Sequence, residues 1–203
     1  MHFPSQVYQP VPANCARHAI ETFAESVAEH LGFIPDRDAA ESLQMRGKVR
    51  VERIQDLIKK IGGQIEFEYV PPSELHTSQS LIVFNEERFE IALLGRYRME
   101  EKDQNWMLAQ ELGHRLLHYP LVVQQHGDVA MAVKRYPDDS DPIARQARRE
   151  ALRFAFGFLT PAKAFMNAYC GTDRPHSLEY RFNVPRRTIE LRYQYLSELK
   201  ASG

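Results

Sequence analysis

Apolar residues change their spacing twice along this chain of 203 residues, and that change constrains the fold more than any other feature. Over 16–31 and 51–61 they recur at intervals of three and four, which predicts amphipathic helices. Ile65, Phe67 and Tyr69 then alternate with polar neighbours, as expected of a strand with one buried face. Helical spacing returns in the second half of the chain. The sequence therefore predicts an α+β fold.

The remaining segments extend this expectation. Strands are predicted over 80–85 and 88–95, and the short link between them indicates a hairpin, so that a small antiparallel or mixed sheet is expected. The helix that includes 105–118 is expected to end at Tyr119–Pro120, because proline disrupts helices. Further helical segments are predicted within 34–48, over 138–159, up to Tyr169, and as a helix pair at the C-terminus. Residues 1–13 contain three prolines and are expected to form an irregular arm.

Charge and cysteine content exclude several classes of protein. A formal net charge of −1 gives no general attraction to nucleic acid or to anionic membranes. Cys15 and Cys170 have no C-x-x-C spacing, which favours a reduced protein. The first residues have no signal-peptide pattern, and no apolar run approaches the about 18 residues that span a bilayer. These features predict a cytoplasmic protein without membrane association.

The segment "MLAQELGHRLLH" (107–118) is the main candidate for chemistry. In zinc proteases H-E-x-x-H places two imidazoles on one helix face, where they bind zinc while the glutamate acts as general base. Here Glu111 and His114 hold the base and second-ligand positions, and Gln110 holds the first. A neutral amide oxygen is a poor zinc ligand compared with imidazole. His118 offers either another imidazole or a packing role at a helix end, and the packing role is favoured.

Three segments in the same order resemble the ImmA/IrrE metallopeptidase family. "NWMLAQELGHRLLH" is similar to its active-site helix, "REALRFAFGFLTP" (149–161) to its second motif, and "LEYRFNVPRRTIELRYQYL" (178–196) to its C-terminal segment. The resemblance covers roughly residues 50–199. It implies a zincin-like helical core with a small sheet, and a bacterial or phage regulator that acts next to helix-turn-helix repressors.

The metal ligands that this resemblance implies are only partly present. Its first histidine falls on Gln110, its base on Glu111 and its second histidine on His114. Its third ligand, a glutamate, falls on Arg148. A guanidinium in place of a metal-binding carboxylate puts a positive charge where the cation would stand. We therefore expect no bound cofactor, with zinc as the alternative.

Two neighbouring positions bear on this expectation. The polar residue that the family carries one turn after the third ligand falls on Leu152. Glu150 keeps acidic character, but it lies about 200° around the helix from Arg148. His118 and Glu150 are thus the possible substitute ligands, and Arg148 is expected to form an ion pair with Glu111.

The C-terminal helix pair admits two interpretations. In one, the pair is a helix-turn-helix that contacts DNA through its basic residues, namely Arg186 and Arg187 with Arg181 and Arg192. Alternatively the pair packs on the peptidase-like core with its arginines in solvent, and we favour this because acidic residues dilute the charge. His126 lies outside any motif and is expected at the surface.

These observations predict three parts: an N-terminal arm and helix (1–49), an ImmA/IrrE-like zincin domain (50–171) and a helix-turn-helix-like appendage (172–203). The expected function is that of a pseudo-peptidase which binds a repressor or another protein partner. An active zinc endopeptidase that cleaves a repressor is the alternative, and a DNA-binding regulator is a further alternative.

Overall fold

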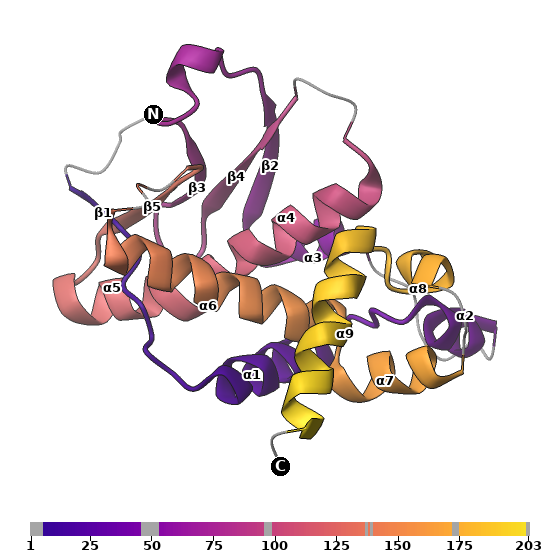
Figure 1. The fold of residues 1–203 in the computed structure, drawn as a ribbon. Helices are drawn as coiled ribbons and strands as arrows, with labels where there is room; N and C mark the ends of the chain where they lie inside the picture. Colours follow the sequence, from indigo (N-terminus) through magenta and orange to yellow (C-terminus); the bar gives the residue numbers. More distant parts are fainter. Residues whose placement is uncertain are drawn as a thin grey trace.

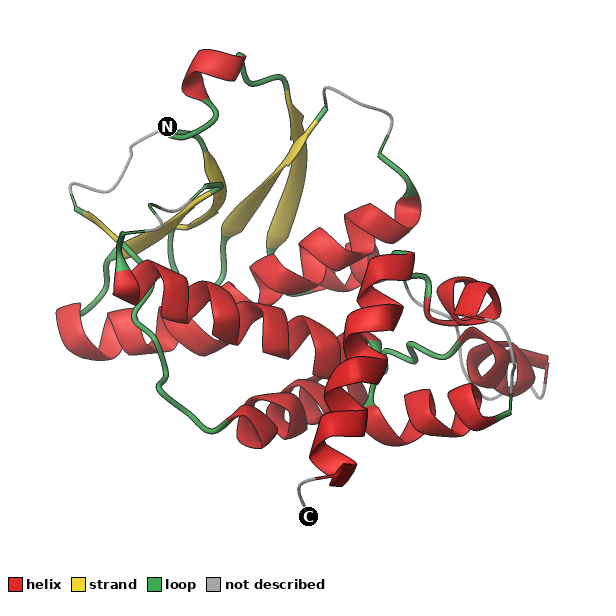
Figure 2. Ribbon diagram, viewed as in Figure 1, coloured by secondary structure: helices red, strands yellow, loops and turns green. Residues whose placement is uncertain are grey.

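A computed structural model of the chain describes residues 6–45, 53–95, 99–136, 138, 140–171 and 175–201. These residues form a mixed five-stranded sheet and a larger helical part that lies on one side of it in the view of Figures 1 and 2. The predicted α+β class is confirmed. No helix among the described residues combines the length and apolar character needed to cross a membrane.

The sheet has the strand order β1-β5-β3-β4-β2. β3 pairs antiparallel with both β4 and β5, whereas β1 runs parallel to β5 and β2 runs parallel to β4. The sheet is therefore mixed, and the hairpin predicted from the short link is present as β3 and β4. The strands are β1 (Val7–Tyr8), β2 (Gly63–Glu68), β3 (Gln79–Val83), β4 (Phe89–Leu94) and β5 (Ala130–Lys134).

Strand β5 has no counterpart among the predicted strands, and neither does β1 in the N-terminal arm. All residues of β5 except the last are buried, so its sequence does not alternate between apolar and polar. A strand that is covered on both faces has this uniform pattern, which periodicity cannot identify. Because β5 was not predicted, the place of the N-terminal arm in the sheet was not predicted either, since β5 joins β1 to the other strands.

The prediction for β2 is correct in position and wrong in burial. Ile65 is half-buried, but Phe67 is 58% exposed and Tyr69, just beyond the strand, is 70% exposed. β2 is an edge strand, and the end that leads to these residues extends beyond the helices in Figure 1. Alternation therefore indicated a strand but not which of its residues are covered.

The helices agree with the predicted spacing, with one exception at Pro120. Gly32 and Gly62, which follow two of the helices, have φ values of +70° and +88°, where glycine is favoured. The helices between β1 and β2 are α1 (Arg17–His30), α2 (Arg37–Met45) and α3 (Ile54–Lys60). Those that follow are α4 (Glu101–Gly113), α5 (Tyr119–His126), α6 (Pro142–Leu159), α7 (Ala162–Cys170), α8 (Pro175–Phe182) and α9 (Arg186–Ala201), with a short 3-10 helix, η1 (Pro72–Glu74), between β2 and β3. Val51, which the sequence placed in the helix before the sheet, lies outside the described residues.

The helix that carries the QELGH segment does not end at Tyr119–Pro120. After α4 it widens into a π-helical segment, η2 (His114–His118), and continues as α5. Pro120 lies in the first turn of α5, where its missing N–H is tolerated. Among the described residues the π turn is confined to these five positions, and such insertions often occur at functional sites.

A single cluster of buried apolar side chains joins the N-terminal helix, the sheet, α4, α6 and the C-terminal pair. α1 packs along α6, and α9 crosses near the C-terminal end of α6 in Figure 1. Arg192 of α9 is fully buried, and its Nη1 lies 2.6 Å from Oε2 of Glu21 in α1. Its Nε donates to the carbonyl of Thr160 at 3.0 Å. Arg192 is thus an internal connection rather than a solvated residue of the helix pair.

Candidate functional site

Helices α4 and α6 approach each other closely at Gly113. A Cβ atom added to Gly113 would lie 3.1 Å from Cα of Ala151 and 3.1 Å from Cβ of Phe154. The absence of a side chain therefore allows the QELGH segment and the second motif to pack directly together. This contact brings side chains from two distant segments to the same place.

A cavity of about 650 Å³ lies beside this contact. Its wall is formed by α4, α6, β5 and the start of α9, together with Gln9 and Pro10 of the N-terminal arm. Gln110, Glu111, His114, Arg148 and Leu152 all line it, so the positions singled out in the sequence lie in one cavity.

These residues do not fit the zinc site that the resemblance implies. Of the three expected ligand positions only His114 carries a good zinc ligand. Gln110 uses its amide Nε2 to donate to the carbonyl of Trp106 at 3.2 Å. Arg148 brings a positive charge into the same cavity, which opposes the binding of a second cation. No catalytic step through zinc can be derived from this set.

Glu111 is buried, and its Oε2 has no hydrogen-bond partner. Burial raises the pKa of this carboxyl to about 7, although the Ser80 hydroxyl and the charges of Arg135 and Arg148 act in the opposite direction. The expected ion pair with Arg148 is not formed within 4.0 Å, and the guanidinium of Arg148 acts on Glu111 only through space. Glu111 is therefore a carboxyl that holds its proton more strongly than usual and loses it only near neutral pH.

His114 is 5% exposed, and burial, with His118 and Arg148 nearby, lowers its pKa well below the usual value. The ring is therefore neutral at physiological pH. Its Nδ1 lies 3.0 Å from Nδ1 of His118, so its Nε2 is the nitrogen left for the cavity.

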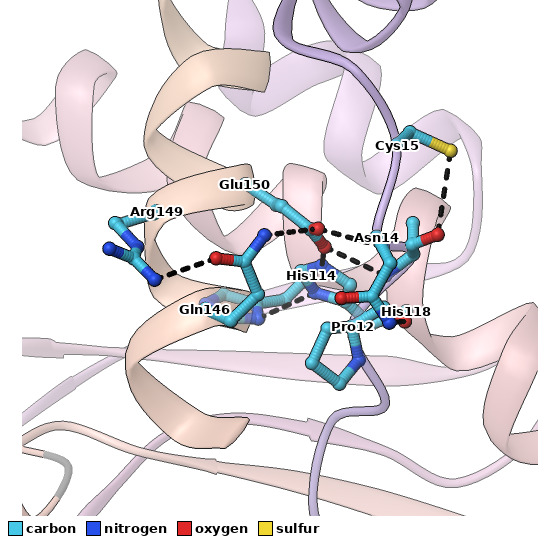
Figure 3. A network of polar contacts seen from close by, with 9 residues as sticks. Pro12, Asn14, Cys15, His114, His118, Gln146, Arg149 and Glu150 are labelled. Atoms are coloured by element: carbon cyan, nitrogen blue, oxygen red, sulfur yellow. Dashed lines mark hydrogen bonds and ion pairs between the residues drawn. The ribbon is translucent and has the colours of Figure 1, made fainter. Parts of the chain in front are cut away.

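The predicted helix-end role of His118 is wrong. His118 is fully buried inside the continuing helix, and its ring nitrogens contact side chains rather than backbone carbonyls. Its Nε2 lies 3.1 Å from Oε2 of Glu150, on the face of α6 that turns away from Arg148. His114, His118 and Glu150 thus form a continuous polar chain (Figure 3).

Glu150 is the centre of this network. It accepts hydrogen bonds from the backbone N–H groups of Ala13 at 2.7 Å and Asn14 at 2.9 Å, and from Nε2 of Gln146 at 2.9 Å. Figure 3 shows Asn14 of the N-terminal arm beside the Glu150 carboxylate, with His114 and His118 close by. A fully buried Glu150 therefore holds the arm, α6 and the histidine pair together.

These contacts set the proton positions in the network. Burial alone would raise the pKa of Glu150, but hydrogen bonds from His118, Gln146 and Ala13 lower it instead. The ionised carboxylate requires Nε2 of His118 to carry a hydrogen. The contact between Nδ1 of His118 and Nδ1 of His114 requires one of these nitrogens to donate and the other to accept.

The two arginines proposed for DNA contact have different surroundings. Nε of Arg186 lies 3.0 Å from Oε1 of Glu190 in an exposed pair one helical turn apart. Arg187 lines the cavity instead. Arg181, also counted as basic in the sequence, pairs with Asp36 at 2.7 Å. His126 is exposed at the end of α5, as expected, and stacks on Tyr8 with ring centroids 4.0 Å apart.

The sequence did not indicate that Arg135 or the N-terminal arm contributes to the site. Arg135 is buried at the end of β5, where Nε donates to Oγ of Ser78 and Nη2 to the carbonyl of Gln79, both at 3.1 Å. Its Nη1 has no hydrogen-bond partner. The only available signal was an arginine directly after a short apolar run, which is weak.

Comparison with known proteins adds no family assignment. No protein-family model matches the sequence, and no curated protein matches it. Within the residues that the structure describes, no group of three or more histidine, cysteine, aspartate or glutamate side chains is arranged to hold a metal ion. The similarity to ImmA/IrrE peptidases therefore depends on the three sequence segments alone.

Proposed function

We propose that this chain is a bacterial or phage regulatory protein with the layout of an ImmA/IrrE-type peptidase that binds a protein partner without hydrolysing it. A helix-turn-helix repressor is the partner that the resemblance favours. The observation that carries the proposal is the position of Arg148. It lines the same cavity as Gln110, Glu111 and His114, where a metal-binding carboxylate is expected.

Physical reasons favour binding over hydrolysis. Glu111 would need a metal-activated water as its substrate in the peptidase mechanism, and the side chains around it do not suit a metal. A cavity of about 650 Å³ lies within the range of 300–1,000 Å³ typical of ligand pockets. We place this activity in the cytoplasm, in keeping with two free, exposed cysteines, Cys15 and Cys170.

Metal analysis tests the lost zinc site. Protein purified without chelator and then exposed to zinc should retain well under one equivalent. The Gln110→His, Arg148→Glu double variant should bind close to one equivalent, because it restores the ligands that the resemblance implies. Near-stoichiometric zinc in the unchanged protein, together with cleavage of a repressor, would establish the alternative of an active endopeptidase.

A cellular test addresses the absence of hydrolysis. In the organism that encodes the protein, the Glu111→Gln variant should restore the transcript profile that is altered by deleting the gene. Glu66→Gln, at an exposed position of β2, is the matched control. If Glu66→Gln restores the profile and Glu111→Gln does not, a mechanism that needs only binding is wrong.

A further inference from the structure

Several polar groups of the cavity have no partner among the residues that the structure describes. Two buried atoms, Oε2 of the acidic Glu111 and Nη1 of the basic Arg135, have no hydrogen bond to any described residue. The guanidinium of Arg148, which is exposed on α6, has no hydrogen bond or ion pair to any described residue. Buried polar groups without partners reduce stability, so their presence together indicates a site that is completed by a ligand.

Basic and acidic residues are equally numerous around the cavity, so the ligand that it favours depends on which charged groups are already engaged. Lys134, Arg135, Arg148 and Arg187 line it, as do Asp103, Glu111, Asp138 and Asp141. Two of these acids are already engaged. Oδ1 of Asp141 accepts from the backbone of Ile143 and Ala144 at the start of α6, and Oδ1 of Asp138 accepts from the backbone of Ser140. Arg135 is engaged as well, since its Nη2 lies 3.7 Å from Oε2 of Glu68. Arg148, which has no hydrogen bond or ion pair to any described residue, is therefore a cation with capacity for a new partner.

Strand β5 provides an edge for an extended chain. β1 pairs only with Ala130 and Met131, and within the described residues no strand occupies that edge over 132–134. The side chains of these three consecutive residues alternate between faces, yet all three residues line the cavity. Residues from both faces of a strand can line one cavity only if the cavity runs along the edge of that strand. The backbone groups of β5 at this edge can therefore pair with an added strand.

The opposite wall is apolar. Trp106 and Met107 of α4, Leu152 of α6 and Leu191 of α9 line the cavity. Gln9 and Pro10, where the N-terminal arm leaves the sheet, also border it. An extended segment beside β5 would therefore contact these apolar side chains and, among them, the guanidinium of Arg148.

We propose that this cavity binds an extended peptide segment of the protein partner, with a carboxylate of that segment paired to Arg148. Guanidinium and carboxylate form two parallel hydrogen bonds, which fix orientation as well as supplying attraction. The carboxylate is either the C-terminus of the segment or an acidic side chain. This inference rests on the proposed binding function and names the chemistry that the site recognises.

The single tryptophan of the chain provides a direct measurement. Trp106 lines the cavity and packs against Phe156 with ring centroids 5.0 Å apart, so a bound peptide should change its fluorescence. The probes are acetyl-Val-Ala-Leu with a free carboxylate, the same peptide as its amide, and acetyl-Val-Asp-Val amide. Saturable binding of either carboxylate probe, and none of the neutral amide, is expected. The probe that binds more tightly identifies the source of the carboxylate.

Variants on α6 make the test specific. Arg148→Met should weaken binding of the carboxylate probe by about 10- to 100-fold, the range for a hydrogen bond to a charged group. Arg145→Met is the matched control, because Arg145 is exposed on the same helix and does not line the cavity. It removes the same charge and should leave the affinity unchanged.

Three results would overturn the inference: equal binding of the neutral amide, equal weakening by both variants, or no binding of either carboxylate probe up to about 10 mM. If the probes fail while a protein partner still co-purifies with the chain from its own cells, only the carboxylate mode is wrong. If no partner is captured either, the proposed function is also in doubt.

Discussion

The polar side chains on the two faces of helix α6 differ in how far their hydrogen-bonding groups are satisfied within the protein. On one face Glu150 is fully buried and accepts four hydrogen bonds, from Ala13, Asn14, Gln146 and His118. Two residues earlier, Arg148 lines the cavity and has no hydrogen bond or ion pair with any residue in the described part of the chain.

This difference separates what holds the fold from what is available for binding. Side chains that satisfy one another contribute to the free energy of folding, and a ligand has little to offer them. Buried groups left without partners, such as Oε2 of Glu111, reduce that free energy, and a ligand can supply what they lack. The retained His114 belongs to both sets, because one ring nitrogen meets His118 and the other is left for the cavity.

Removing the Glu150 carboxylate, whose hydrogen bonds are satisfied, should have the largest effect on the free energy of unfolding. Glu150→Ala leaves two backbone N–H groups and His118 without their acceptor inside the protein. We expect a loss of about 3–5 kcal/mol in the free energy of unfolding, as for removal of one partner of a buried charged network. Denaturant unfolding measures it, with Glu90→Ala in β4, whose pair with Arg88 is partly exposed, as the control. A loss below about 1 kcal/mol would contradict the central role of Glu150.

Changing Glu111, an unsatisfied group that α4 contributes to the cavity facing Arg148, should act in the other direction. The folded-state pKa of Glu111 is about 7, above the usual 4.5, so folding favours the protonated form. Stability from this group is therefore complete below pH 4.5 and is lost as the pH rises to about 7. Glu111→Gln removes that loss and should stabilise the protein by about 2–3 kcal/mol at pH 8.

The pH dependence of the Glu111→Gln effect is its own control. The same substitution should have little effect at pH 4, where both forms of the protein carry a neutral group at this position. Unfolding curves of the variant and the unchanged protein at the two pH values measure the difference. An equal effect at both values would mean that charge burial at Glu111 is not the cause.

The smallest effect is expected at Arg148. Since its guanidinium makes no hydrogen bond and is exposed, Arg148→Met should change the free energy of unfolding by no more than about 0.5 kcal/mol. Arg192→Met, at a fully buried ion pair, gives the contrasting case and should be strongly destabilising. Comparable losses for the two arginines would remove the distinction between a structural and a binding residue.

The helices and the hairpin could be predicted because each has its own repeat of apolar residues. β5 could not, because a short and uniformly apolar strand has no repeat that distinguishes it from a buried helical turn. β1 has only two residues and exists because β5 supplies its partner. The burial of Phe67 was overestimated for the related reason that alternation does not report where the helix layer stops.

The candidate site was predicted in part. The convergence of Gln110, Glu111, His114 and Arg148 followed from matching two segments about 40 residues apart. The role of Glu150 did not, although a clue was present, since it occupies the same buried stripe of α6 as Ala147, Ala151 and Phe154. A carboxylate on such a stripe requires several donors. Those donors come from an arm 136 and 137 residues away, which sequence spacing does not reveal.

The contact between Glu21 and Arg192 has a consequence for protein synthesis. The two residues are 171 positions apart, so α1 leaves the ribosome long before its partner in α9 is made. At about 5–20 residues per second this delay is roughly 10–30 seconds. During that time the carboxylate of Glu21 has no guanidinium partner, and until α6 is made α1 also lacks the helix along which it packs. Early termination of translation before α9 would therefore leave Glu21 of the N-terminal helix without its buried partner.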